Sequence, residues 1–276
     1  MSAPTAREAF TALAGREERE IGLLEGALLI AQEEYPDLPL PGHVRRVDEI
    51  ADRLRPHVGP SSGFHNAVYS VNRMLFEELG FRGNATDYND PDNSMMNRVL
   101  ERKTGIPITL AILYIEVGLR LGLPVFGVSF PGHFLVGYGD PSGTSYVDPF
   151  HSGRILIRED LARLLSGLAG DDAELRPEFL GPATKRVILT RVLHNLKSLY
   201  YRNGDFRRSL LAAEQSVLLN PDAPAEVRDR GLLRRLMGDT DTARSDLTTY
   251  LSLAPDAPDA EKIRGLLRED ERGPAE

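Results

Sequence analysis

The pair formed by His133 and Asp148 is the place where residue types and spacing in this sequence could support chemistry. His133 follows Pro131-Gly132 at the start of one predicted strand, and Asp148 ends the next strand. If the hairpin between them turns at residues 140–143, residue 148 lies opposite residues 134–135, and the two side chains can meet on one face of the sheet. A carboxylate beside an imidazole fixes the imidazole tautomer and raises its basicity. The pair therefore predicts either half of a nucleophilic triad or a hydrogen-bonded pair that only stabilises the hairpin.

A nucleophile to complete such a triad is missing. The chain contains no cysteine, which excludes disulfides, thiolate metal sites and every mechanism that uses a cysteine nucleophile. The first turn of the helix predicted to begin at Pro107 would favour a developing anion, but Ile106, Pro107 and Ile108 carry no group that can attack a substrate. Thr109 is the nearest hydroxyl. It is a candidate for catalysis or for positioning, although a threonine in a first turn more often bonds to the backbone.

The spacing of the other polar residues indicates no metal and no cofactor. None of the six histidines is joined to another by an H-x-H or H-x-x-x-H pattern. A metal site made of His133, Asp148 and His151 would need ligands that converge from loops. Glycine-rich fingerprints for phosphate binding are absent as well. We therefore expect no metal ligand set and no nucleotide cofactor.

Net charge and hydropathy exclude several kinds of partner. The chain has 33 Lys and Arg against 41 Asp and Glu, a net charge of −8, so non-specific binding of nucleic acid has no electrostatic basis. No window holds the roughly 18 uninterrupted apolar residues of a membrane span, and residues 1–14 lack the pattern of a secretory signal. We expect a cytoplasmic protein whose partners are proteins, peptides or small molecules.

Hydrophobic periodicity predicts the elements that must position the pair. Helical spacing covers 23–30, 44–54, 64–79, 95–100 and 107–122, with a turn-rich loop at 83–94. Strand-like segments then follow at 125–130, 133–138, 144–147 and 154–157. The helix at 107–122 is apolar on several sides and should be buried. Helices followed by an antiparallel meander make an α+β arrangement.

The last 90 or so residues contain an internal repeat of 34 residues. A shift of 34 superimposes Gly204-Asp205 on Gly238-Asp239 and residues 221–224, P-D-A-P, on residues 255–258. Thirty-four is the tetratricopeptide period, in which two helices are joined by a turn of small residues. Two repeats are fewer than the usual minimum of about three, so they should lean on the preceding domain.

Several motifs of the chain resemble the SirB-type proteins, in which a transglutaminase-like core precedes tetratricopeptide repeats. They are N-S at 93–94, V-L-E-R-K-T-G-I-P-I-T-L at 99–110, L-G-L-P at 121–124, F-P-G-H-F-L-V at 130–136 and Y-V-D-P-F at 146–150, with E-E-Y-P at 33–36 and F-E-E-L-G-F-R-G-N at 76–84 upstream. The resemblance covers roughly residues 20 to 260 and implies a papain-like core. It places His133 and Asp148 on the family's His and Asp positions and the missing Cys near Pro107 or Ile108. The SirB-type family as a whole shares that absence.

Two functions remain open from the sequence. The first is a binding or regulatory module that recognises a protein or peptide through the repeats. The second is an enzyme for amide or peptide hydrolysis or acyl transfer, with His133, oriented by Asp148, as general base and a small amide or peptide in the core cleft. A purely structural core is a third possibility. Candidate binding residues are Tyr88, Asn93, Ser94 and Phe134 in the core and Tyr200, Tyr201 and Arg207 in the repeats.

The expected organisation has four parts. Residues 1–82 form the N-terminal helical part of the core, residues 83–166 the transglutaminase-like core, residues 167–183 a linker and residues 184–276 the helical repeats. Residues 138–143 are either a plain hairpin loop or a flap over the site.

Overall fold

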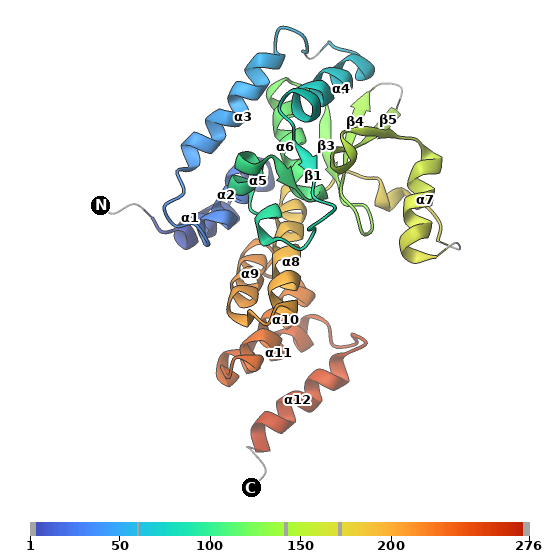
Figure 1. Ribbon diagram of the computed structural model, residues 1–276. Coiled ribbons are helices and arrows are strands. Elements are labelled where there is room, and N and C mark those ends of the chain that lie inside the picture. Colours follow the sequence, from blue (N-terminus) through green and yellow to red (C-terminus); the bar gives the residue numbers. More distant parts are fainter. Residues whose placement is uncertain (1–3, 60, 141–142, 171–172, 273–276) are drawn as a thin grey trace. The chain divides into compact units, whose positions relative to one another are not determined.

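The computed structural model describes residues 4–59, 61–140, 143–170 and 173–272. The chain folds into two units, Met1–Val192 and Leu193–Glu276, and Figure 1 shows their elements. Each unit is described by itself. Within the described ranges, no helix combines the length and the hydropathy needed to cross a membrane.

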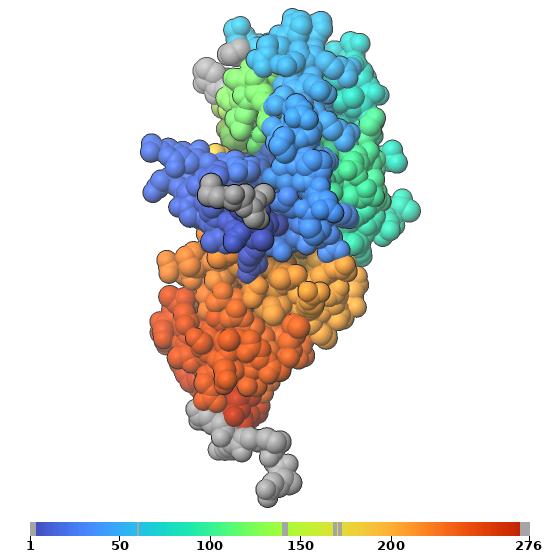
Figure 2. Space-filling model, turned by 90° about the vertical axis from the view of Figure 1, so that its left-hand side faces the viewer, coloured from blue at the N-terminus to red at the C-terminus, as the bar shows by residue number. Residues whose placement is uncertain are grey.

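Helices make up the first half of the first unit. They are α1 (Ala6–Ala14), α2 (Leu23–Gln32), α3 (Leu40–Leu54), α4 (Phe64–Asn72) and α5 (Met96–Arg102). The helix predicted at 64–79 changes at Arg73 into the π-helical segment η2 (Arg73–Glu78), a widening that periodicity does not reveal. Figure 2 shows the side of this unit on which α1 to α3, in blue, form the outer surface.

The central element of the unit is α6 (Pro107–Arg120), as its apolar sequence predicts. Eleven of its 14 residues are buried, and it packs against β3 and β4 of the sheet. Pro107 occupies the first turn, where the missing N–H costs nothing. The helix therefore forms the rigid layer against which both the sheet and the loop before α5 are placed.

The sheet is an antiparallel meander, as predicted. Its strands are β3 (Val125–Val128), β4 (Leu135–Asp140), β5 (Gly143–Asp148) and β6 (Arg154–Leu156), in that order. Val136 pairs with Val147, so residue 148 lies opposite residue 135. Residues 141–142 of the predicted loop or flap at 138–143 lie outside the described residues.

One predicted strand begins later than expected. The sequence predicts that His133 opens the strand, but β4 begins at Leu135. The reason is a tight turn at Pro131-Gly132, where Gly132 has a φ of 63° and the backbone N–H of His133 donates to Phe130 O at 3.1 Å. His133 therefore lies in the turn that precedes the strand.

A second helix, α7 (Arg158–Ala169), packs against the sheet. Leu161 and Leu165 of α7 share a buried cluster with Val128, Leu135 and Leu156 of the strands. Side chains alternate along a strand, and Val125 is the residue that meets α6 at Gly118, so α6 and α7 cover opposite faces. Because α7 continues to residue 169, the first residues of the predicted linker 167–183 are helical, a correction caused by the apolar stripe of α7.

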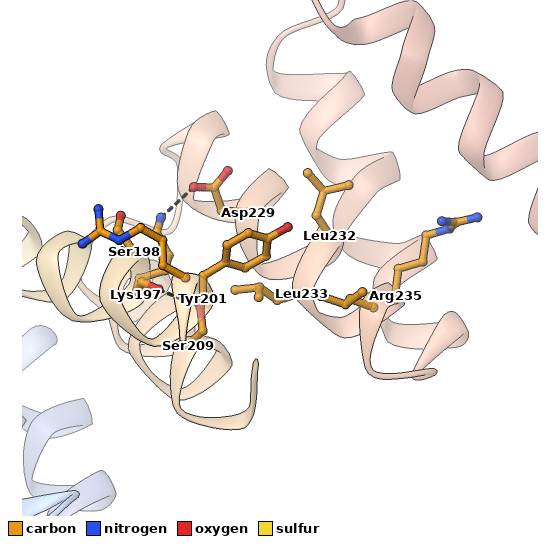
Figure 3. Close-up of a pocket in the computed structure, with 10 residues that line it drawn as sticks. Lys197, Ser198, Tyr201, Ser209, Asp229, Leu232, Leu233 and Arg235 are labelled. Carbon is orange, nitrogen blue, oxygen red and sulfur yellow. Dashed lines mark hydrogen bonds and ion pairs between the residues drawn. The ribbon is translucent and has the colours of Figure 1, made fainter. Parts of the chain in front are cut away.

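Five helices make up the repeat region. They are α8 (Lys185–Arg202), α9 (Phe206–Leu219), α10 (Pro224–Leu236), α11 (Thr240–Leu253) and α12 (Ala260–Arg272), and the division between the two units falls within α8. Lys197 of α8 contacts Asp229 of α10 at 2.6 Å (Figure 3), and Arg235 of α10 contacts Asp270 of α12 at 3.0 Å. Ion pairs thus join alternate helices.

The 34-residue repeat is confirmed in the backbone. Gly204 and Gly238 have φ values of 76° and 84°, and the aspartate after each glycine caps the next helix. Asp205 accepts from the N–H of Arg208, and Asp239 accepts from the N–H of Thr242. The two Gly-Asp pairs that are 34 residues apart in the sequence therefore begin α9 and α11 in the same way.

Removal of one repeat cap tests this correspondence. Asp205→Ala should lower the free energy of unfolding by about 1 kcal/mol, because one backbone N–H of α9 loses its acceptor. Urea unfolding of the full chain measures the change. Asp222→Ala, at an exposed aspartate in the turn before α10, is the control and should change stability by less than about 0.5 kcal/mol. Equal effects of the two substitutions would contradict the capping role.

Candidate functional site

The Asp148 carboxylate is the meeting point of two imidazoles. His133 Nε2 lies 2.9 Å from Asp148 Oδ2, and His151 Nδ1 lies 2.7 Å from the same oxygen. The other oxygen, Oδ1, accepts from the backbone N–H of Phe150 at 3.0 Å and of His151 at 3.4 Å. The Asp148 side chain is 2% exposed, that of His133 12% and that of His151 58%. The structure therefore brings the predicted pair together and adds a third residue.

A single tight turn explains why His151 joins the pair. Asp148 ends β5 and caps the 3₁₀ turn η4 (Pro149–His151), so residues 148 and 151 lie on the same side of it. The chain then reverses through Ser152 and Gly153, both with positive φ, at 55° and 74°. Asn72 Nδ2 donates to Gly153 O at 2.8 Å, and a Cβ on Gly153 would lie 2.0 Å from Asn72 Oδ1. Only glycine fits here.

The electrostatics of Asp148 favour its charged form. Burial by itself would raise the pKa of Asp148, but the hydrogen bonds and charges of His133 and His151 outweigh burial and lower the pKa. A buried carboxylate that stays ionised orients both imidazoles, because each of them presents a nitrogen to the same oxygen.

Phe150 forms an aromatic wall beside the two imidazoles. Its ring centroid lies 6.2 Å from that of His133 and 5.2 Å from that of His151, both edge to face. The ring centroid of Tyr88 lies 6.1 Å from that of Phe150, and burial raises the pKa of Tyr88. A Cβ on Gly83 would lie 2.6 Å from Phe150 O, so the strand β1 (Arg82–Gly83) supports this wall. Tyr88, a predicted binding residue, is 46% exposed and close to the cluster.

The start of α6 has a structural role, which corrects two expectations. Thr109 is fully buried, and its hydroxyl donates to Asn93 O at 2.8 Å while it accepts from Ile106 N at 3.1 Å. Asn93 and Ser94 are buried too, at 0% and 5% exposed. Because these groups are used inside the protein, Thr109 is not placed to attack or position a substrate. Asn93 and Ser94 are likewise held in the interior.

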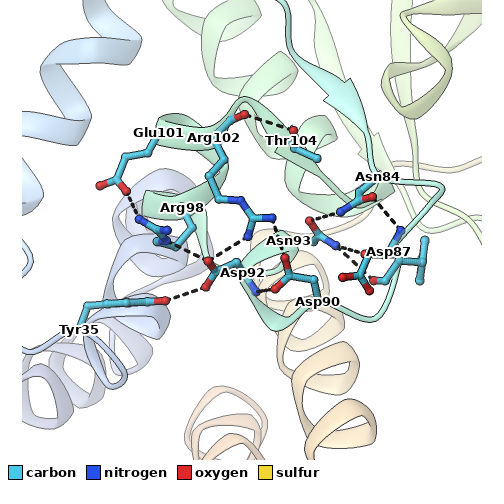
Figure 4. Close-up of polar contacts among 11 residues, drawn as sticks. Tyr35, Asn84, Asp87, Asp90, Asp92, Asn93, Arg98, Glu101, Arg102 and Thr104 are labelled. Atoms are coloured by element: carbon cyan, nitrogen blue, oxygen red, sulfur yellow. Dashed lines mark hydrogen bonds and ion pairs between the residues drawn. The ribbon is translucent and has the colours of Figure 1, made fainter.

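Asn93 organises the loop that precedes α5 (Figure 4). Its side-chain N–H groups donate to Asp87 O at 2.7 Å and to Tyr88 O at 3.4 Å. Its amide oxygen accepts from Asn84 Nδ2 at 3.1 Å. A buried amide that satisfies both donors and its acceptor holds one loop conformation, and Tyr88 is thereby fixed beside Phe150.

An ion-pair network ties the same loop to α5 and to the segment after α2 (Figure 4). Asp92 accepts from Tyr35 Oη at 2.7 Å, from Arg98 at 3.0 Å and from Arg102 at 2.9 Å. Asp90 pairs with Arg102 at 2.6 Å. Sequence reasoning gave these residues no role. For Tyr35, the E-E-Y-P motif at 33–36 is the one signal in the sequence, because a single tyrosine before a proline shows no hydrophobic periodicity.

Two aromatic residues predicted to contact a ligand belong to the interior instead. Phe134 is 1% exposed, and its Cζ would lie 3.0 Å from a Cβ on Gly127 of β3. Tyr200 is 7% exposed, with the Arg208 guanidinium 5.6 Å from its ring centroid. Both expectations are corrected for one reason: the rings fill space between packed elements and leave almost no surface for a partner.

Tyr201, by contrast, lines a groove in the repeats (Figure 3). The groove holds about 500 Å³ and is lined by residues of α8 and α10, with one from α9: Lys197, Ser198, Tyr201, Arg202, Ser209, Asp229, Leu232, Leu233, Arg235 and Leu236. Tyr201 is 54% exposed and Leu236 51%. Arg207, the third predicted repeat residue, is exposed but is not part of this lining.

The arrangement in the core can hold and orient an imidazole. With Nε2 of His133 on Asp148, the remaining nitrogen, Nδ1, is the one that could accept a proton. The first residues of α6 offer no nucleophile, since they are Ile106, Pro107 and Ile108. Because the chain contains no cysteine, cysteine-dependent acyl transfer is excluded at this site.

The role of Thr109 can be tested by removal of its hydroxyl. Thr109→Val keeps the shape but leaves Ile106 N and Asn93 O without their partner, so the free energy of unfolding should fall by about 1–3 kcal/mol. Thr249→Val is the matched control, because that exposed hydroxyl bonds only the carbonyl of its own preceding turn. Denaturant unfolding compares the two, and a neutral Thr109→Val would contradict the structural role.

The charge of Asp148 predicts a pH dependence of stability. Because its folded pKa is lowered, the carboxylate contributes stability that is fully present above about pH 4, the ordinary aspartate pKa, and is lost as pH falls through the folded pKa. The free energy of unfolding of Asp148→Asn should therefore differ from that of wild type above about pH 4, and this difference should narrow in stronger acid. Urea unfolding at pH values between about 3 and 7 measures this. A difference that stays constant with pH would contradict it.

Comparison with known proteins agrees with this architecture. Residues 43–194 match the family model for the transglutaminase-like superfamily, and residues 196–268 match a tetratricopeptide repeat. A UPF0162 protein of Xylella fastidiosa (strain 9a5c) is 41% identical over 262 residues, 94% of this chain and 93% of the relative. One from Vibrio cholerae is 32% identical over 246 residues, 88% of this chain and 90% of the relative.

The similarity to solved structures is more distant. The crystal structure of menin has a TM-score of 0.46 at 10% sequence identity, covering 100% of this chain and 80% of the menin chain. From the match over residues 43–194 and the full-length relatives, the chain belongs to the transglutaminase-like superfamily, as a UPF0162-type protein whose core is followed by tetratricopeptide repeats.

Proposed function

We propose that this chain is a cysteine-less transglutaminase-like protein that binds a segment of a protein partner through its helical repeats. The observation that carries the proposal is the groove along α8 and α10, of about 500 Å³. Repeat proteins of this kind use such extended surfaces for binding, and transglutaminase chemistry through a cysteine is excluded by the composition.

The groove offers an apolar surface to a partner. Tyr201, Leu232, Leu233 and Leu236 contribute apolar side chains, and Tyr201 and Leu236 are more than half exposed. Figure 3 shows the ring of Tyr201 between Asp229 and Leu233. A rigid aromatic ring beside leucines suits an apolar or aromatic anchor side chain of a bound peptide, the kind of contact that dominates interface energies.

Three of the four charged side chains that line the groove, those of Lys197, Asp229 and Arg235, form ion pairs within the repeats. Lys197 contacts Asp229, and Arg235 contacts Asp270, at 2.6 and 3.0 Å. A cation that is neutralised within its own fold adds little to the attraction of an acidic partner. The proposed ligand is therefore a segment with an apolar anchor, and its affinity should change little with salt.

Substitution at the rim of the groove tests the proposal. The partner segment is first identified by photo-crosslinking from a photoreactive phenylalanine at Tyr201 in the full-length chain. Fluorescence anisotropy then compares wild type, Leu236→Asp and Leu253→Asp. Leu236→Asp should weaken binding at least 10-fold, about 1.4 kcal/mol, because a charge replaces an exposed apolar contact in the groove.

Leu253→Asp is the matched control. Leu253 is 40% exposed in α11 and does not line the groove, so the same change there should alter the affinity by less than about 2-fold. Circular dichroism confirms that both variants fold. Equal weakening by the two substitutions, or none by Leu236→Asp, would contradict groove binding.

A further inference from the structure

We propose that His133, Asp148 and His151 form a site for one divalent transition-metal ion of the zinc type. One ligand atom from each residue, Nε2, Oδ2 and Nδ1 respectively, lies within 4.8 Å of the other two. The site lies in the first unit and is independent of the groove in the repeats.

Two of the three separations among the donor atoms are close to the spacing that such an ion requires. Zinc binds imidazole nitrogen and carboxylate oxygen at about 2.0–2.2 Å, so two ligands of a tetrahedral ion lie about 3.3 Å apart. Both imidazole nitrogens of the site now lie 2.7–2.9 Å from Asp148 Oδ2. An increase of about half an ångström, through small rotations of His133 and the exposed His151, would admit the ion.

The carboxylate is held as a metal ligand needs to be held. Asp148 Oδ1 accepts two backbone N–H groups from the η4 turn, so Oδ2 is directed toward the two imidazoles. Hydrogen bonds of this kind to the non-ligating atoms orient ligands and are a regular part of metal sites. The hydrogen bond from Asn72 to the carbonyl of Gly153 also holds this turn in place.

The charge of the site also favours a cation. Among the contacts of the described residues, Asp148 pairs with imidazoles and with no lysine or arginine, although it is 2% exposed. A divalent ion held by all three side chains would place a stronger positive charge beside this buried carboxylate than the imidazoles supply. Because neutral imidazole and carboxylate are the donors, the set suits zinc and its neighbours rather than calcium or magnesium, which prefer oxygen alone.

Solvent access completes the site. The His151 side chain is 58% exposed, which gives an entry path from solvent. Three protein ligands leave one tetrahedral position for water, which is the composition of an open, exchangeable site. The ring of Phe150 lies edge to face with both imidazoles.

Zinc titration of the full-length, tag-free, chelator-treated protein tests the proposal. Isothermal titration calorimetry with ZnCl₂ near neutral pH should give one ion per chain with a Kd below about 1 µM. His151→Ala should weaken the affinity at least 10-fold, and His133→Ala should do the same. His57→Ala removes an exposed imidazole outside the cluster and should leave both the stoichiometry and the Kd unchanged.

A second readout separates ligation from general surface affinity. Co²⁺ added to the wild type should give visible absorption bands of a four-coordinate ion, and His151→Ala, whose exposed side chain can be removed without unfolding the chain, should lose them. Zinc affinity should also fall as pH drops through the range in which imidazole protonates. If His151→Ala binds zinc as tightly as wild type, or wild type takes up less than one ion per chain, the cluster is a hydrogen-bonded triad only. Peptide binding at the groove is measured separately and does not depend on this result.

Discussion

Two histidines share one oxygen of a buried aspartate, and the arrangement of the core depends on that constraint. Asp148 divides its two oxygens between two tasks: Oδ1 caps a 3₁₀ turn, and Oδ2 accepts from His133 and His151. The cap fixes the 3₁₀ turn η4 that follows β5, and this turn places His151 beside His133. A change in the position of Asp148 would therefore disturb both the local backbone and the two imidazoles.

Elements far apart in the sequence converge to support this arrangement. Asn72, the last residue of α4 before the π-helical segment, holds the carbonyl of Gly153. The parallel pair β1 and β2 (Thr104–Gly105) brings Gly83 against Phe150, and Thr109 joins the start of α6 to the loop at Asn93. The position that the resemblance assigns to a cysteine is filled by apolar residues, and the chain contains no cysteine.

Much of this architecture could be predicted from the sequence, because its signals are local or periodic. The meeting of His133 and Asp148 followed from the length of one hairpin, and the repeat pair followed from a shift of 34 residues. Spacing in the sequence did not support the approach of His151 to this pair, because that approach depends on a 3₁₀ turn and a left-handed Ser152, and no periodicity indicates either.

The burial of individual candidate binding residues also could not be predicted from the sequence. Tyr200 and Tyr201 are neighbours in sequence, yet about 100° separates them around the helix axis, and only tertiary packing decides that Tyr200 is inside and Tyr201 outside. Phe134 and Thr109 look like ligand contacts from their motifs, but Phe134 packs against Gly127 of β3 and Thr109 caps α6.

The most direct test of the role of Asp148 is to measure the tautomers of the two imidazoles by ¹⁵N nuclear magnetic resonance of the metal-free protein. If Asp148 Oδ2 accepts from both rings, neutral His133 carries its proton on Nε2 and neutral His151 carries its proton on Nδ1. Asp148→Asn should release both preferences. A wild-type His133 with its proton on Nδ1, or tautomer populations that Asp148→Asn leaves unchanged, would contradict the central role of this carboxylate.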